Sequence, residues 1–185
     1  MSDRELGRAL REAAYLEGDF VLRSGRRSRY YLDKYRFETR PDLLGPIGAA
    51  IARAVTEHDP EASRLAGPEL GAVALAAAAS LAGGLPFLIV RGEAKTYGTA
   101  NRLEGVFEEG ERVCLVEDVI TSGGAALEAV EALRAAGLLV STAICVVDRE
   151  EGGVDALARH GVRLRPLFGA SELLEGSKLP ANPLG

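Results

Sequence analysis

The sequence has few of the residues on which several common protein classes depend. Only two of its 185 residues are cysteine, Cys114 and Cys145, and each lies in an apolar run. Two such cysteines are too few for a disulfide framework or a four-ligand zinc site, and we interpret them as small buried hydrophobic residues. No window offers the ~18 apolar residues of a membrane span, and the N-terminus has no apolar signal segment. The composition therefore predicts a cytoplasmic protein.

Positive charge is scarce over the chain as a whole. Twenty-two lysine and arginine residues stand against 27 acidic residues, which gives a formal net charge of -5. Bulk electrostatics therefore does not attract the chain to nucleic acid or to an anionic membrane, and we expect neither as a partner. An anionic ligand needs positive charge gathered locally. Residues 19–40 hold seven basic and three acidic residues, net +4, and residues 91–102 hold three basic and one acidic residue, net +2.

What the sequence does contain is the pattern of a single α/β domain. Apolar residues make up 47% of the chain and charged residues 26%, as in one globular domain. Apolar residues at intervals of three and four predict helices over 3–14 and from Pro41 to about residue 58. Short β-rich runs then alternate with helical runs, which is typical of a parallel sheet covered on both faces. We expect strands at 64–66, 86–90, 112–117, 140–147 and 162–166, and helices at 69–82, 125–136 and 154–159.

Two further segments depart from this alternation. In residues 19–40 the basic side chains are interleaved with the aromatic residues Tyr30, Tyr31, Tyr35 and Phe37 around a Ser-Gly pair, and we interpret the segment as two short strands joined by a turn. Residues 92–110 show no sustained apolar period, are rich in glycine and are too long for an ordinary connection. We interpret them as a mobile functional loop with a hairpin.

The most specific segment begins at Arg112 and reads RVCLVEDVITSGGA. A buried strand ends in two adjacent carboxylates, Glu117 and Asp118, and passes through a hydroxyl- and glycine-rich turn into a helix. The free N–H groups and the positive dipole end at the start of that helix form an anion nest, to which Thr121 and Ser122 add hydroxyl donors. The two carboxylates suit the vicinal hydroxyls of a sugar. Phosphate donors beside diol acceptors predict a ribose 5-phosphate site.

The commonest other phosphate motifs are missing. The sequence contains no GxxxxGK[ST] run of a P-loop, and no GxGxxG follows a strand as in a dinucleotide-binding fold. Taken piece by piece, the same residues could be a polar strand end and a helix cap. The unbroken string favours the ribose 5-phosphate site.

The string from Val116 to Ala125 resembles the phosphoribosyl-pyrophosphate (PRPP) binding motif of the type I phosphoribosyltransferases. Residues 20–31 resemble the substrate hood of the orotate-using members of that family, and residues 90–98 resemble their catalytic loop. Residues 67–71 occupy the place of the family's pyrophosphate-contacting loop. The similarity extends from about residue 14 to about residue 173.

The resemblance implies a fold and a domain layout. The fold is the type I phosphoribosyltransferase fold, an α/β fold with a central, mostly parallel sheet flanked by helices. Residues 1–185 form one domain, with a small N-terminal hood at about 1–40 that the C-terminal segment completes, a core at about 41–168 and the flexible catalytic loop at about 92–110. The resemblance also implies a homodimer.

The resemblance implies a reaction as well. The orotate-using members transfer the ribose 5-phosphate group of PRPP to orotate, giving orotidine 5′-monophosphate and pyrophosphate in de novo pyrimidine (UMP) biosynthesis. Magnesium arrives mainly on PRPP, so no resident metal site is expected. Breaking the bond from C1′ to pyrophosphate builds positive charge on the ribose and negative charge on the leaving group. The protein therefore chiefly stabilises separating charges and excludes water, without a covalent nucleophile.

Carried over residue by residue, the resemblance implies a catalytic group and two sets of ligands. Lys95 is the expected catalytic residue, because its charge would neutralise the leaving pyrophosphate. The residues expected to bind PRPP are Arg91, Lys95, Glu117, Asp118, Val119, Ile120, Thr121, Ser122, Gly123, Gly124 and Ala125. Those expected to bind orotate are Arg23, Tyr30, Tyr31, Thr121 and Arg149. The tyrosines would supply a flat wall, and Arg149 a bidentate partner for the orotate carboxylate.

The chain departs from the family pattern at three positions. Gly92 and Tyr97 replace a lysine and a histidine of the usual catalytic loop, and Gly71 stands where some members have a pyrophosphate-binding lysine. Two alternatives therefore stay open: a PRPP-binding regulator that has lost catalysis, and a phosphoribosyltransferase for uracil or a purine. The intact hood argues against the regulator, while the hood and Arg149 bear on the choice of base.

With these cations missing, we expect catalysis to depend on Lys95 and Arg91. Lys95→Ala should lower the turnover number by roughly 10²-fold, the usual effect of removing one group that stabilises developing charge. Steady-state kinetics with saturating substrates measures this change. An unaltered turnover number would show that the assignment of Lys95 is wrong.

Overall fold

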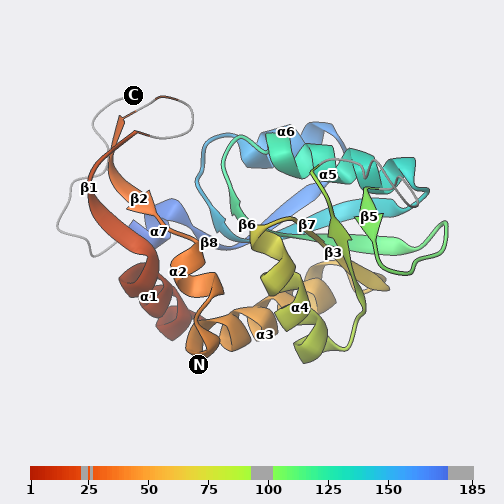
Figure 1. Cartoon of the computed structure of the whole chain (residues 1–185), viewed down its shortest axis with the longest axis horizontal. Helices are drawn as coiled ribbons and strands as arrows, with labels where there is room; N and C mark the ends of the chain where they lie inside the picture. The colour runs from red at the N-terminus through yellow and green to blue at the C-terminus, as the bar shows by residue number, and fades with distance from the viewer. Residues whose placement is uncertain (22–24, 26, 93–101, 175–185) are drawn as a thin grey trace.

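The computed structural model describes residues 1–21, 25, 27–92 and 102–174, and it forms an α/β body that carries a separate two-stranded ribbon (Figure 1). The body is built on a six-stranded sheet with the strand order β5-β4-β3-β6-β7-β8. Every neighbouring pair is parallel except β4 and β5. The strands are β3 (Arg64–Pro68), β4 (Phe87–Val90), β5 (Leu103–Glu104), β6 (Arg112–Ile120), β7 (Leu139–Asp148) and β8 (Arg163–Gly169).

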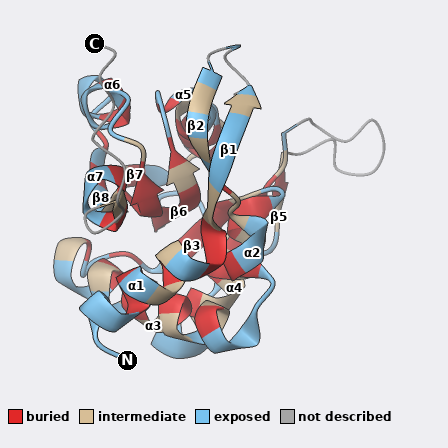
Figure 2. Cartoon of the chain, turned by 90° about the vertical axis from the view of Figure 1, so that its left-hand side faces the viewer, coloured by how far each residue is buried: buried red, intermediate tan, exposed pale blue. Residues whose placement is uncertain are grey.

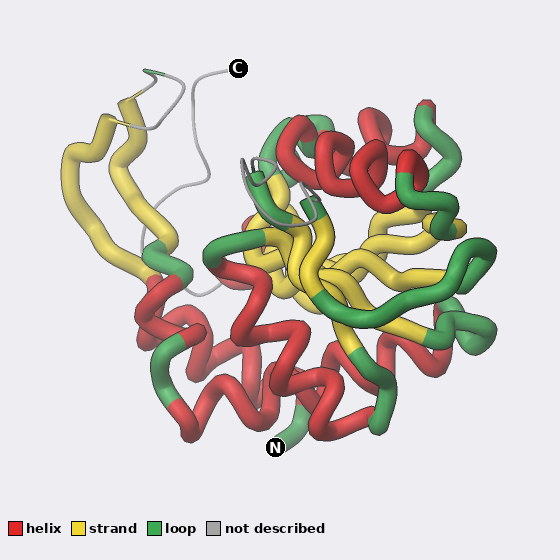
Figure 3. Tube along the Cα trace, turned by 45° about the vertical axis from the view of Figure 1, so that its right-hand side comes forward, coloured by secondary structure: helices red, strands yellow, loops and turns green. Residues whose placement is uncertain are grey.

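Helices cover both faces of this sheet, as the alternating pattern predicts. Figures 1 and 3 show α3 and α4 on one face, with α1 and α2 beside them, and α5 and α6 on the other. The helices are α1 (Asp3–Ala14), α2 (Tyr35–Glu38), α3 (Pro41–His58), α4 (Gly71–Gly83), α5 (Gly124–Ala135), α6 (Gly153–Arg159) and α7 (Ala170–Leu174). Within the described ranges, no helix combines the length and the apolar character that crossing a membrane requires.

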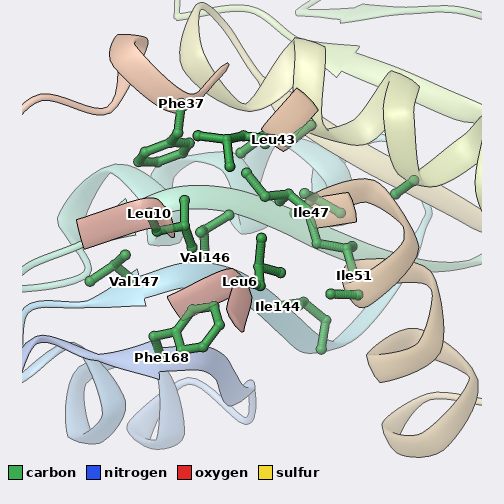
Figure 4. Close-up of a cluster of buried hydrophobic side chains, with 14 of the residues drawn as sticks. Leu6, Leu10, Phe37, Leu43, Ile47, Ile51, Ile144, Val146, Val147 and Phe168 are labelled. Atoms are coloured by element: carbon green, nitrogen blue, oxygen red, sulfur yellow. The ribbon is translucent and has the colours of Figure 1, made fainter. Parts of the chain in front are cut away.

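The central strands separate two hydrophobic cores. Because successive strand residues point to opposite faces, Cys114 of β6 packs into the core under α1, α3 and α4, while its neighbour Leu115 packs into the core under α5 and α6. Figure 4 shows the first core, where Leu10 of α1, Ile47 of α3 and Phe168 of β8 converge. Both cysteines are free and buried, as expected from the sequence.

The ribbon contains the two short strands that the pattern of residues 19–40 predicts, and it begins earlier than expected, at Tyr15. Strands β1 (Tyr15–Val21) and β2 (Arg27–Leu32) pair antiparallel and project from the body, with mostly exposed and half-buried residues (Figure 2). The base of the ribbon is held by a hydrogen bond from the Asp33 N–H to the Ala14 carbonyl oxygen, 2.9 Å, and by the burial of Leu32.

Several element boundaries differ from the sequence expectations. The expected strand at 112–117 continues as β6 to Ile120, because Val119 and Ile120 pair with Val147 and Asp148 of β7. The hairpin expected within 92–110 forms instead between β4 and β5, which pair antiparallel. Residues 93–101 of that loop lie outside the described residues. Helices α2 and α7 are short, and the sequence analysis did not predict them.

The close packing of α3 against α4 gives a test of the fold. A Cβ atom added at Gly48 would lie 2.6–2.7 Å from the backbone and Cβ of Ala78. Helix propensity alone predicts that Gly48→Ala stabilises the chain by about 1 kcal/mol. The overlap predicts the opposite sign, a free energy of unfolding lower by about 1–3 kcal/mol, measured by urea unfolding. A more stable variant would contradict the packing of these two helices.

Candidate active site

The candidate site lies where β3 and β6 end side by side. The chain leaves β3 through α4 toward β4, and it leaves β6 through α5 toward β7, so the two connections run to opposite sides. Helices α4 and α5 also cover opposite faces of the sheet (Figure 1). In open α/β sheets such a reversal leaves a crevice at the carboxyl ends of the strands, and ligands bind there.

The turn after β6 leaves an anion nest open at this crevice. Gly123 adopts φ +85° as the N-cap of α5, and a Cβ there would lie 3.0 Å from a methyl group of Leu157, so the position requires glycine. Thr121, Ser122, Gly124 and Ala125 are exposed. In the described structure no side chain caps the first turn of α5, whose N–H groups and dipole therefore face solvent. This geometry suits a phosphate monoester.

The two acidic residues of the motif are buried next to that nest. Glu117 and Asp118 are 7% and 5% exposed, and they are neighbours on β6. Burial, together with the charge of Asp118, raises the pKa of Glu117 to about 8. Among the described residues, Glu117 Oε1 finds no hydrogen-bond partner. A sugar hydroxyl is the type of donor that this oxygen lacks.

Two residues join this acidic pair, Lys34 directly before α2 and Glu38 in α2, and the sequence analysis missed both. Lys34 Nζ donates to Asp118 Oδ2 at 2.5 Å. Burial disfavours the charged lysine, but the hydrogen bond and charge of Asp118 outweigh it, so the pKa of Lys34 is raised. Glu38 is 4% exposed, and burial, followed by the nearby Asp118, raises its pKa to about 8. One signal was available: Lys34 is one of only three lysines among 22 basic residues.

The ends of β3 and β4 form the neighbouring part of the crevice edge. Glu69 follows β3, and its Oε1 accepts a hydrogen bond from the Gly92 N–H at 2.8 Å. Its Oε2 lies 3.9 Å from Arg91 Nη1. Arg91 Nε is buried and has no hydrogen-bond partner in the described part of the chain. Lys95, the expected catalytic residue, lies outside the described residues.

The structure brings together two of the residues expected at the orotate. Arg149 directly follows β7, its N–H donates to the Ile120 carbonyl oxygen at 2.8 Å, and its guanidinium carbon lies 5.2 Å from the centre of the Tyr30 ring. The ring of Tyr30 stacks in turn on Tyr15. The Arg149 side chain is 8% exposed, and it approaches Glu151 at 3.2 Å. The pair offers a flat aromatic wall and a cation beside the phosphate motif.

The other expected orotate ligands are not gathered in this way. Tyr31 is the strand neighbour of Tyr30, so it points to the opposite face of the ribbon, where it packs on Phe20 with ring centres 5.6 Å apart. Tyr31 therefore lies on the face of the ribbon opposite to the one that contacts Arg149. Thr121 lies on the exposed turn after β6, and Arg23 lies outside the described residues.

Comparison with known proteins decides the family. A scan against models of protein families found no match. Orotate phosphoribosyltransferase of Methanocella arvoryzae is 49% identical over 173 residues, which cover 93% of this chain and 97% of that protein. This chain belongs to the orotate phosphoribosyltransferase family.

Solved structures of the orotate phosphoribosyltransferase family share the fold. The crystal structure from Aeropyrum pernix superposes with a TM-score of 0.82 at 36% identity, covering 92% of this chain and 97% of that one. The enzyme from Mycobacterium tuberculosis in complex with PRPP gives a TM-score of 0.78 at 32% identity, covering 93% and 99%. The type I phosphoribosyltransferase fold implied by the sequence is therefore confirmed.

The buried acids of this site predict a pH-dependent stability. An acid whose pKa is raised by folding contributes stability that is complete below its unfolded value near 4.5 and is lost as the pH rises through about 8. Replacing Glu38 by glutamine removes this loss. The melting temperature of Glu38→Gln minus that of the unsubstituted chain should therefore increase as the pH rises from 4.5 to 8. Thermal unfolding over that range measures the difference.

A matched control is Glu131→Gln, since Glu131 is an exposed glutamate on α5. Its melting curve should follow that of the unsubstituted chain at every pH. Parallel curves for Glu38→Gln as well would show that Glu38 does not carry this proton.

Proposed function

We propose that the chain transfers the ribose 5-phosphate group of PRPP to orotate, forming orotidine 5′-monophosphate and pyrophosphate in pyrimidine biosynthesis. The observation that carries the proposal is the position of Arg149. Its backbone N–H bonds to the last residue of the β6 strand of the PRPP motif, and its guanidinium lies against the ring of Tyr30. A site for a planar anion is thereby fixed next to a site for a ribose phosphate.

The ribose phosphate would bind along β6 and the turn that follows it. The open N–H groups of α5 and the hydroxyls of Thr121 and Ser122 would hold the 5′-phosphate. Glu117 and Asp118 would accept hydrogen bonds from the ribose hydroxyls. These contacts fix C1′ relative to the base, which lowers the entropy cost of bringing the two reactants together.

Orotate would lie beside Tyr30 with its carboxylate on Arg149. The guanidinium presents a planar fork that matches a carboxylate, and its Nε is buried without a hydrogen-bond partner in the described part of the chain. Glu151 Oε1 lies 3.2 Å from Arg149 Nη2, so the orotate carboxylate would meet a guanidinium already held by a carboxylate. The pairing of the orotate carboxylate with Arg149 would orient the base so that N1 faces the ribose.

The leaving pyrophosphate would depart toward the ends of β3 and β4. Arg91 lies at that edge of the crevice, and its Nε keeps a donor without a hydrogen-bond partner among the described residues. Lys95, which follows on the loop, would add the second cation, as the family resemblance implies. Both charges would stabilise the negative charge that grows on the diphosphate as the bond from C1′ lengthens.

Magnesium would enter with PRPP, and the residues present fit that ion. Diphosphate oxygens and carboxylates are the ligands that magnesium prefers, and Glu117 Oε1 is a buried carboxylate oxygen without a hydrogen-bond partner among the described residues. The ion would neutralise charge on the diphosphate. Within the described ranges no group of three histidine, cysteine or acidic side chains could hold a metal ion by itself.

The proposal extends to assembly and location. We expect a homodimer, and α4 supports it, because this helix has no charged residue in its 13 positions and leaves Leu81 90% exposed. Leu70, at the turn before α4, is 74% exposed. Apolar side chains that a monomer leaves in water are typical of protein interfaces. We further propose that the enzyme works in the cytoplasm.

The decisive experiment mixes the full chain, magnesium and PRPP with orotate, uracil, adenine or hypoxanthine, and follows base consumption and pyrophosphate release. Orotate alone should turn over. Arg149→Gln should raise the KM for orotate by about 10–100-fold, the effect of losing charged hydrogen bonds, and leave the KM for PRPP within about threefold. Arg159→Gln, an exposed arginine on α6, is the matched control.

The other outcomes separate the alternatives. Saturable PRPP binding without turnover of any base would favour a regulator. Turnover of uracil or a purine in place of orotate would assign the chain to another base. If Arg149→Gln raised the KM for orotate and the KM for PRPP alike, Arg149 would support the whole site and would not select the base.

A further inference from the structure

Lys34 reaches the PRPP motif from a distant part of the chain. It precedes the first turn of α2, 84 positions before Asp118, and its ammonium group lies 2.5 Å from Asp118 Oδ2. The Lys34 side chain is 32% exposed, and that of Asp118 is 7% exposed. The ion pair is therefore partly withdrawn from water, where a charge-assisted hydrogen bond holds its geometry more tightly than on an open surface.

Gly71, the first residue of α4, lies directly against the ion pair of Lys34 and Asp118. A Cβ atom built on Gly71 would overlap Asp118 Oδ2 and lie 2.9 Å from Lys34 Nζ. Glycine at this position therefore leaves the space that the carboxylate and the ammonium group occupy. Three segments meet here, since the residue before α2 supplies the cation, β6 the anion and α4 the gap.

The charge balance of this region depends on Lys34. The described residues place three carboxyl groups near one another, those of Glu38, Glu117 and Asp118, and one ammonium group, that of Lys34. The raised pKa of Lys34 and the raised pKa values of the two glutamates agree with a cluster in which one carboxylate is paired and the others resist ionisation. Asp33 and Tyr35 flank this cluster on the same segment.

We propose that Lys34 is a positioning residue for PRPP, which holds the Asp118 carboxylate in the gap left by Gly71 so that it meets the ribose hydroxyls as a fixed anion. This inference rests on the proposed function. Each carboxylate oxygen has two lone pairs, so Asp118 Oδ2 can accept from Lys34 and from a hydroxyl at once. Without the ammonium group, Asp118 would share a proton with Glu38 and Glu117 or turn toward water, and the acceptor would be lost.

The test uses two ligands that differ only in the hydroxyls. Ribose 5-phosphate and 2,3-dideoxyribose 5-phosphate are titrated into the full chain by calorimetry. Lys34→Met should lower the affinity for ribose 5-phosphate by about tenfold or more, the usual effect of losing a charged acceptor. The affinity for the dideoxy compound should stay within about twofold. Arg36→Met removes an exposed cation two residues further along the chain, in α2, and should change neither affinity.

A second variant reaches the same contact by another route. In Gly71→Ala the added methyl group displaces the Asp118 carboxylate, so this variant should show the same selective loss, and it keeps the test decisive if Lys34→Met does not fold. Equal weakening of both ligands would overturn the proposal, because Lys34 would then act on the phosphate or on the fold. Unchanged binding of both ligands in a folded variant would overturn it as well.

Failure of the proposed function appears elsewhere in the same experiment. Turnover of PRPP and orotate is measured with the unsubstituted chain in parallel. An inactive unsubstituted chain counts against the proposed function, whereas the Lys34 inference is decided by the difference between the two ligands in the variants.

Discussion

The site depends on one constraint of the sheet, the reversal of direction between β3 and β6. Because α4 leaves β3 on one face and α5 leaves β6 on the other, the ends of these two strands are left between helices rather than beneath them. The turn with Thr121, the loop with Glu69 and the hood residue Tyr30 come from distant parts of the chain, and the first two border this opening directly. Burial in the two cores fixes the strands, and the strands fix the opening.

Electrostatics in the opening follows from burial more than from net charge. The chain is acidic as a whole, and the site itself contains buried carboxyl groups close together. Burial raises the pKa values of Glu38 and Glu117 to about 8, and Lys34 pairs with the remaining acid. Two arginines follow parallel strands of the same sheet, Arg91 after β4 and Arg149 after β7. The site therefore combines cations with buried hydrogen-bond acceptors.

The sequence predicts best what is local. The motif from Arg112 to Ala125 is one continuous segment, so its strand, turn and helix could be read from neighbouring residues, and the alternation of elements predicts the parallel sheet. The pairing of Lys34 with Asp118 spans 84 positions and leaves no local pattern. Tyr30 and Tyr31 look equivalent in the sequence. Because neighbouring strand residues point to opposite faces, Tyr30 contacts Arg149 whereas Tyr31 packs on Phe20. Strand β6 extends past its expected end because its partner β7 supplies hydrogen bonds.

The two cysteines can report on how often each hydrophobic core opens. Cys114 belongs to the core under α1, α3 and α4, and Cys145 to the core under α5 and α6. Burial raises the pKa of both thiols, so neither forms a thiolate readily while its core is closed. A thiol reagent can modify each residue only when that face of the sheet opens. The chain thus carries one natural reporter for each half of its interior, and the two labelling rates compare the opening of the two halves without any engineered probe.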